Sequence, residues 1–96
     1  MITHVVLLQP KEGVAENEII TILQHVEELQ HHIPGIIGVE TGKNLSASNQ
    51  GYTFGFILRF TDSEHLQAFA PHPAHQRVSQ ELQGVCQKGI DFDIEH

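Results

Sequence analysis

The order of alternating and helical apolar patterns along the chain is the feature that most constrains its fold. Four segments with apolar residues at alternate positions, or short β-branched runs, predict strands. These predicted strands are Ile2–Gln9, Ile36–Lys43, Tyr52–Thr61 and Lys88–Glu95. Between the first two, apolar residues recur at helical spacing over Ala15–His32 and predict an amphipathic helix.

Local signals predict where the helices begin. Asn17 is a candidate N-cap for the first helix, because a side-chain oxygen at that position can accept a hydrogen bond from a free backbone N–H group. Asp62 or Ser63 is expected to cap a short helix after the third strand. Pro73 is suited to the first position of a further helix over Ala74–Val85.

The resulting order is strand, helix, strand, strand, helix pair, strand. Two split β-α-β units of this kind predict one ferredoxin-like α+β domain over residues 1–96, with helices on one face of a four-stranded antiparallel sheet. Yet Ile2–Gln9 and Tyr52–Thr61 carry apolar residues on both of their faces. A monomer would expose the uncovered face as a large apolar patch, so we expect a homodimer joined through the sheet faces.

Charge and cysteine content narrow the classes of partner. Twelve acidic residues against five basic ones give a net charge of −7. This balance disfavours nucleic acid and anionic membrane surfaces, which bind through positive charge. No apolar run is long enough to span a bilayer. Cys86 is the single cysteine, so no internal disulfide can form, and a cytoplasmic location is expected.

Six short motifs lie in a defined order along almost the whole chain. They are His4–Leu7, Ile33–Ile36, Gly51–Thr53, Arg59–Ser63, His72–His75 and Ile90–Asp93. In this order and spacing the sequence resembles the stress-responsive dimeric α/β-barrel (Dabb) family. The resemblance implies two ferredoxin-like protomers whose sheets close a shared barrel.

The function implied by this resemblance is broad. The family includes stress-associated proteins without a known activity and a cofactor-independent polyketide cyclase. We therefore expect a small hydrophobic or aromatic molecule to bind in the barrel, without a cofactor. Two alternatives stay open: a cofactor-independent enzyme of cyclase, lyase or isomerase type, and a self-assembling structural protein that binds no ligand.

Two histidines are the candidates for chemistry. His75 would lie in the first turn of a helix, where the positive end of the helix dipole favours the neutral imidazole that a general base requires. In the resembling cyclase the second histidine of the motif is the proposed base, and it corresponds to His75. An aromatic hydroxyl assists that base at the position occupied here by Phe69, which has none. The alternative is a structural role, in which the His72–His75 motif only caps the helix and packs at the mouth of the barrel.

His4 lies among apolar residues of the first strand, so it is expected to be buried with a hydrogen-bond partner, either His75 or a backbone carbonyl. Structural and catalytic roles for His4 both stay open.

A ligand cavity between sheet and helices is expected to be bordered by aromatic and polar side chains. The candidate ligand-binding residues are Tyr52, Phe54, Phe69 and His72. His25, Glu28 and His32 share one helix face, but such residues more often form a solvated surface, and no metal site is predicted.

Overall fold

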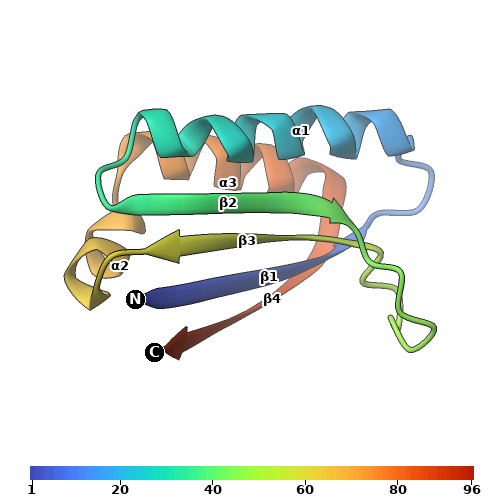
Figure 1. Ribbon diagram of the computed structural model, residues 1–96. Coiled ribbons are helices and arrows are strands. Elements are labelled where there is room, and N and C mark those ends of the chain that lie inside the picture. The colour runs from blue at the N-terminus through green and yellow to red at the C-terminus, as the bar shows by residue number, and fades with distance from the viewer.

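Four antiparallel strands form one sheet, and the helices lie on one of its faces (Figure 1). A computed structural model describes all of residues 1–96. The strands are β1 (Ile2–Pro10), β2 (Ile36–Lys43), β3 (Phe54–Phe60) and β4 (Cys86–Glu95), in the order β2-β3-β1-β4. The helices are α1 (Glu16–Glu28), η1 (Leu29–His31), α2 (Ser63–Phe69) and α3 (Pro73–Val85). This arrangement confirms the predicted ferredoxin-like α+β fold.

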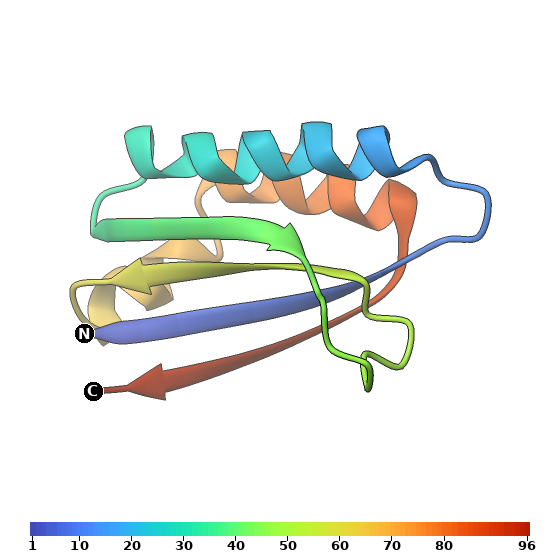
Figure 2. The same ribbon diagram turned by 45° about the vertical axis from the view of Figure 1, so that its right-hand side comes forward.

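Most predicted element boundaries are close to the observed ones. The strand over Ile36–Lys43 is confirmed residue for residue, and Pro73 is the first residue of α3, as predicted. The third strand is shorter than the predicted Tyr52–Thr61, and the fourth begins at Cys86, two residues before the prediction. Both termini lie side by side at one end of the sheet (Figure 1, Figure 2).

The start and end of α1 differ from the prediction. Ala15, in an extended conformation, is the N-cap and gives no side-chain hydrogen bond, so the prediction of Asn17 as the cap is wrong. Asn17 lies inside the first turn, and its carbonyl accepts a hydrogen bond from the Thr21 hydroxyl at 2.9 Å. After Glu28 the helix tightens into the 3₁₀ turn η1, which ends the helical region before Pro34.

Asp62 caps α2, which confirms the first of the two candidates. Its side chain accepts a hydrogen bond from the His65 backbone N–H at 3.0 Å. The His65 ring lies so close to Gly35 that a Cβ atom at residue 35 would be 2.3 Å from it. Gly35 also has φ of 88°, so this turn requires glycine for both reasons.

The core lies between the sheet and the helices. Alternate residues of β3 face the helices and are buried: Phe54, Phe56, Leu58 and Phe60. The apolar stripe of α1 packs against them with Ile19, Ile22, Leu23 and Val26. None of the helices has both the length and the apolar character needed to cross a membrane.

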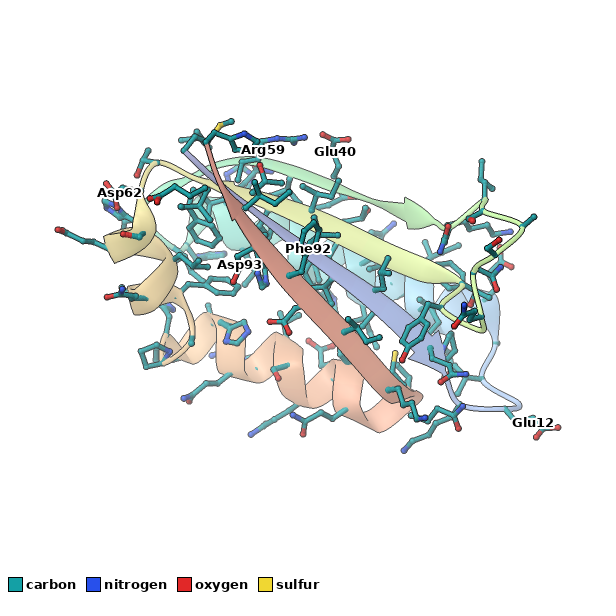
Figure 3. The ribbon with its side chains drawn as sticks, turned by 90° about the horizontal axis from the view of Figure 1, so that it is seen from below. Glu12, Glu40, Arg59, Asp62, Phe92 and Asp93 are labelled. Atoms are coloured by element: carbon teal, nitrogen blue, oxygen red, sulfur yellow. The ribbon has the colours of Figure 1, made fainter.

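The face of the sheet opposite the helices has no cover within the chain and is called the open face. Val5 of β1 pairs with Ile57 of β3 on one side and with Phe92 of β4 on the other, so the three side chains form a row on this face. The outermost strand exposes the largest apolar groups, with Ile90 at 50%, Phe92 at 55% and Ile94 at 41%. Figure 3, which views the molecule from below, shows β4 in the foreground.

Candidate functional site

A cavity of about 530 Å³ lies between the β1–β4 half of the sheet and helices α2 and α3. Its volume is within the range of ~300–1,000 Å³ usual for small-molecule sites. Twelve of its 21 lining residues are hydrophobic. The apolar wall from α1, α2 and α3 includes Val26, Leu66, Phe69, Val78 and Leu82.

His75 borders this cavity from the first turn of α3. Its Nδ1 lies 2.9 Å from the backbone carbonyl oxygen of Ala70. A carbonyl can only accept, so Nδ1 carries the proton and donates it. In the neutral ring the other nitrogen, Nε2, therefore has a free lone pair.

His4 borders the same cavity from β1 and is paired with an acid. It is the one polar side chain in the buried core, at 8% exposure. Its Nδ1 donates a hydrogen bond to a carboxylate oxygen of Asp93 on β4. The two residues are directly opposite in the β1–β4 register. The prediction that His4 pairs with His75 or with a backbone carbonyl is therefore wrong.

Asp93 is the functional candidate that sequence reasoning missed. The alternation of Lys88–Glu95 places Asp91, Asp93 and Glu95 on one face of the strand, but it does not say which face meets the helices. Pairing with β1 decides this, because Asp93 is opposite the buried His4. Figure 3 shows the side chains of Asp93 and Phe92 leaving β4 in different directions.

Phe69 separates the two imidazoles. Its ring centroid is 5.9 Å from that of His4 and 4.2 Å from that of His75. Phe60 closes the cluster from β3, with its centroid 5.1 Å from that of Phe69. The structure thus brings together His4, Phe69 and His75, and the aromatic ring between the histidines has no hydroxyl.

The other predicted ligand residues do not line the cavity. The His72 Nδ1 accepts a hydrogen bond from the Ala74 backbone N–H at 3.1 Å, so His72 is the N-cap of α3. Phe54 is buried in the core, and Tyr52 lies in the loop before β3, where its carbonyl accepts a hydrogen bond from Asn44.

Cys86 is a further lining residue, at the start of β4. Partial burial raises the pKa of its thiol above the ordinary value for cysteine, and the positive charge of Lys11 opposes this only in part. The thiol is therefore protonated at neutral pH and is a weak nucleophile.

The structure groups no three His, Cys, Asp or Glu side chains in a way that could hold a metal ion. On α1, His25 pairs instead with Glu81 of α3, at 2.9 Å between Nδ1 and the carboxylate oxygen.

Comparison with known proteins agrees with the fold. The curated stress-response A/B barrel domain-containing protein HS1 of Arabidopsis thaliana is 29% identical over 94 residues, which cover 96% of this chain and 86% of that protein. A crystal structure of a dimeric ferredoxin-like protein of unknown function from Jannaschia sp. CCS1 is 29% identical with a TM-score of 0.86, and the match covers 99% and 98% of the two chains.

The hydroxynitrile lyase from Passiflora edulis has the same fold, with a TM-score of 0.86 at 18% identity, over 97% of this chain and 90% of that one. Residues 2–96 match the family described as the stress responsive A/B barrel domain, Dabb. The chain belongs to this family.

Proposed function

We propose that this protein binds a small apolar or aromatic molecule in the cavity between β4 and α3. The observation that carries the proposal is the cavity itself, about 530 Å³ in volume with a mainly hydrophobic lining. Burying an apolar ligand there would be favourable by roughly 25 cal/mol for each Å² removed from water.

Two imidazoles supply the polar contacts for such a ligand. His75 offers the free lone pair of Nε2, and the Nε2 of His4 makes no hydrogen bond within the chain. A ligand that carries a hydroxyl group can therefore donate a hydrogen bond at this end of the cavity while its apolar part contacts Val78 and Leu82.

The binding unit in this proposal is a homodimer joined through the open faces of two sheets. The exposed Ile90, Phe92 and Ile94 would be covered by the same surface of a second copy. The family is named for an A/B barrel, and the related Jannaschia protein is described as dimeric. The unpaired Cys86 is consistent with the reducing cytoplasm as the location.

A binding experiment tests the ligand proposal. Titration calorimetry with 3-phenylpropanol, whose aromatic ring and hydroxyl match the two ends of the cavity, should give saturable binding. Ser79→Phe should abolish it, because Ser79 lines the cavity and a larger side chain would fill it. Gln80→Phe is the matched control, since the neighbouring Gln80 does not line the cavity. Absence of binding to the wild-type protein, or equal loss in both variants, would refute the proposal.

A second candidate function is cofactor-independent proton transfer with His75 as the general base. The hydrogen bond from Nδ1 to Ala70 favours it, because this bond leaves Nε2 as the acceptor in the cavity. The Passiflora protein of this fold is a lyase, so the fold accommodates catalysis there. Phe69 has no hydroxyl to share the proton, which sets this site apart from the cyclase pattern.

Two measurements test the catalytic candidate. Nitrogen-15 NMR should show the neutral His75 ring protonated at Nδ1, and protonation at Nε2 would contradict the assignment. On a panel of polyketide-like and hydroxynitrile substrates, His75→Ala should lower turnover by about 10²–10⁴-fold. Unchanged turnover in a folded His75→Ala variant, or no turnover by the wild-type protein, would eliminate this candidate.

A further inference from the structure

The charges around the cavity are unevenly distributed. The titratable side chains among its lining residues are His4, His75, Cys86, Lys88, Asp91 and Asp93. Asp91 pairs with Val6 and Asp93 with His4, so both acids lie on the strand face that the helices cover. Lys88 pairs with Gln9, which alternates with the buried Leu8, so its side chain is directed to the open face.

The two acids differ in their partners. Asp93 accepts the hydrogen bond from His4, and the pair satisfies both groups. Asp91 takes part in none of the five ion pairs of the chain. It is exposed on β4, where the cavity meets solvent. An unpaired negative charge therefore borders the cavity, and no lysine or arginine side chain on the same strand face balances it.

We propose that Asp91 makes the cavity selective for the charge of its ligand. An apolar skeleton that ends in a protonated amine binds in preference to the same skeleton that ends in a carboxylate. This inference rests on the proposed ligand binding and names the class of ligand, an apolar amine.

The physical basis is the position of Asp91 at the rim of an apolar cavity. A ligand that buries its ring against Val78 and Leu82 places its terminal group at the end of the cavity that holds the histidines. Asp91 is two residues from Asp93, the partner of His4, on the same strand face, so this terminal group lies within the field of the Asp91 carboxylate. A carboxylate there is repelled by Asp91 and gains no cation in exchange. The chain's net charge of −7 adds a weaker repulsion of anions at low salt.

Three probes with one skeleton separate charge from shape. They are 3-phenylpropylamine, 3-phenylpropanol and 3-phenylpropanoate, titrated at pH 7 and low ionic strength. A single exposed charge pair changes affinity by about two- to fivefold. We therefore expect the amine to bind about two- to fivefold more tightly than the alcohol, and the carboxylate to bind more weakly by a similar factor. Added salt should narrow both differences.

Variants assign the effect to Asp91. Asp91→Asn should remove most of the preference for the amine, and Asp91→Lys should reverse it in favour of the carboxylate. Glu95→Gln and Glu95→Lys are the matched controls, because Glu95 lies on the same face of β4 but does not line the cavity. Asp91→Asn and Glu95→Gln change the net charge of the chain by the same amount, and so do Asp91→Lys and Glu95→Lys.

The outcomes distinguish this inference from the proposal on which it rests. Binding of all three probes with equal affinity would overturn the charge selectivity and leave ligand binding in place. Equal effects of the Asp91 and Glu95 variants would show a general field and overturn the role of Asp91. Failure of the alcohol, the amine and the carboxylate to bind would overturn both proposals. The expected result is that Asp91→Lys binds the carboxylate more tightly than the amine, whereas Glu95→Lys still binds the amine more tightly.

Discussion

The His75 imidazole lies against the ring of Phe69, with the two ring centroids 4.2 Å apart and their planes at 46°. Phe69 is 4% exposed and also contacts the rings of His4 and Phe60. One aromatic side chain of the short helix α2 therefore fixes the distance between the two histidines of the cavity. Stability and site geometry depend on the same ring.

Phe69→Ala is expected to lower the free energy of unfolding by about 3–5 kcal/mol, because the variant loses buried apolar surface and leaves a void in the core. Urea denaturation followed by circular dichroism measures this change. Leu45→Ala is the control, since Leu45 is 91% exposed and its removal should change stability by less than about 0.5 kcal/mol. Similar losses in both variants would contradict the role of Phe69 in the core.

The open face provides the test of the homodimer. Phe92→Asp would place a charge among Val5, Ile57 and the partner's apolar side chains, so we expect the dimer dissociation constant to rise at least about tenfold. Sedimentation equilibrium at micromolar concentration should give twice the mass of one chain for the wild-type protein. The same substitution at the exposed Leu45 should leave association unchanged. A monomeric wild-type protein, or a Phe92→Asp variant that associates normally, would refute the sheet-face dimer.

Asp62 gives the protein an acid-sensitive contribution to stability. The hydrogen bond from the His65 backbone N–H is the main reason that the pKa of Asp62 is lowered from its ordinary value, and a second hydrogen bond from the His65 side chain lowers it further. A carboxyl group with a lowered folded pKa stabilises the folded state above its unfolded pKa, and the stabilisation is lost as pH falls through the folded value.

Thermal unfolding between pH 5 and pH 2 measures this contribution. Asp62→Ala should have a lower midpoint than the wild-type protein at pH 5. The difference between the two midpoints should become smaller as pH falls toward 2. Asp62→Asn, which keeps an acceptor oxygen for the cap, should lose less at pH 5. A constant difference between the wild-type protein and Asp62→Ala across this range would show that the carboxylate charge contributes nothing.

The sequence predicted the fold better than it predicted the site, and the reason is physical. Strand and helix patterns are local, so alternation and spacing suffice to find them. The His4–Asp93 pair depends on the register between the first and last strands, which lie almost a full chain length apart. Tyr52 and Phe54 were expected near the ligand because they share a strand pattern with Phe56, but the cavity reaches only part of that strand. The position of His75 in a first turn was predictable, because Pro73 marks the start of its helix.

Cys86 offers a chemical measure of the cavity and of what occupies it. Because burial raises the pKa of its thiol, the fraction present as reactive thiolate at pH 7 is smaller than for an exposed cysteine. We expect iodoacetamide to alkylate Cys86 more slowly than an exposed thiol. The reference is a variant with Cys86→Ser and Ser48→Cys, which moves the single cysteine to an exposed loop.

Saturating 3-phenylpropanol should slow the alkylation of Cys86 further, because Cys86 lines the cavity and a bound ligand restricts access to it. The same concentration should leave the rate at the introduced Cys of the Ser48→Cys variant unchanged. Mass spectrometry of samples taken over time gives both rates. Equal rates for the two thiols without ligand would contradict the burial of Cys86. A ligand that binds by calorimetry but leaves the Cys86 rate unchanged would lie outside the cavity, since a molecule within it contacts the same wall from which the thiol projects.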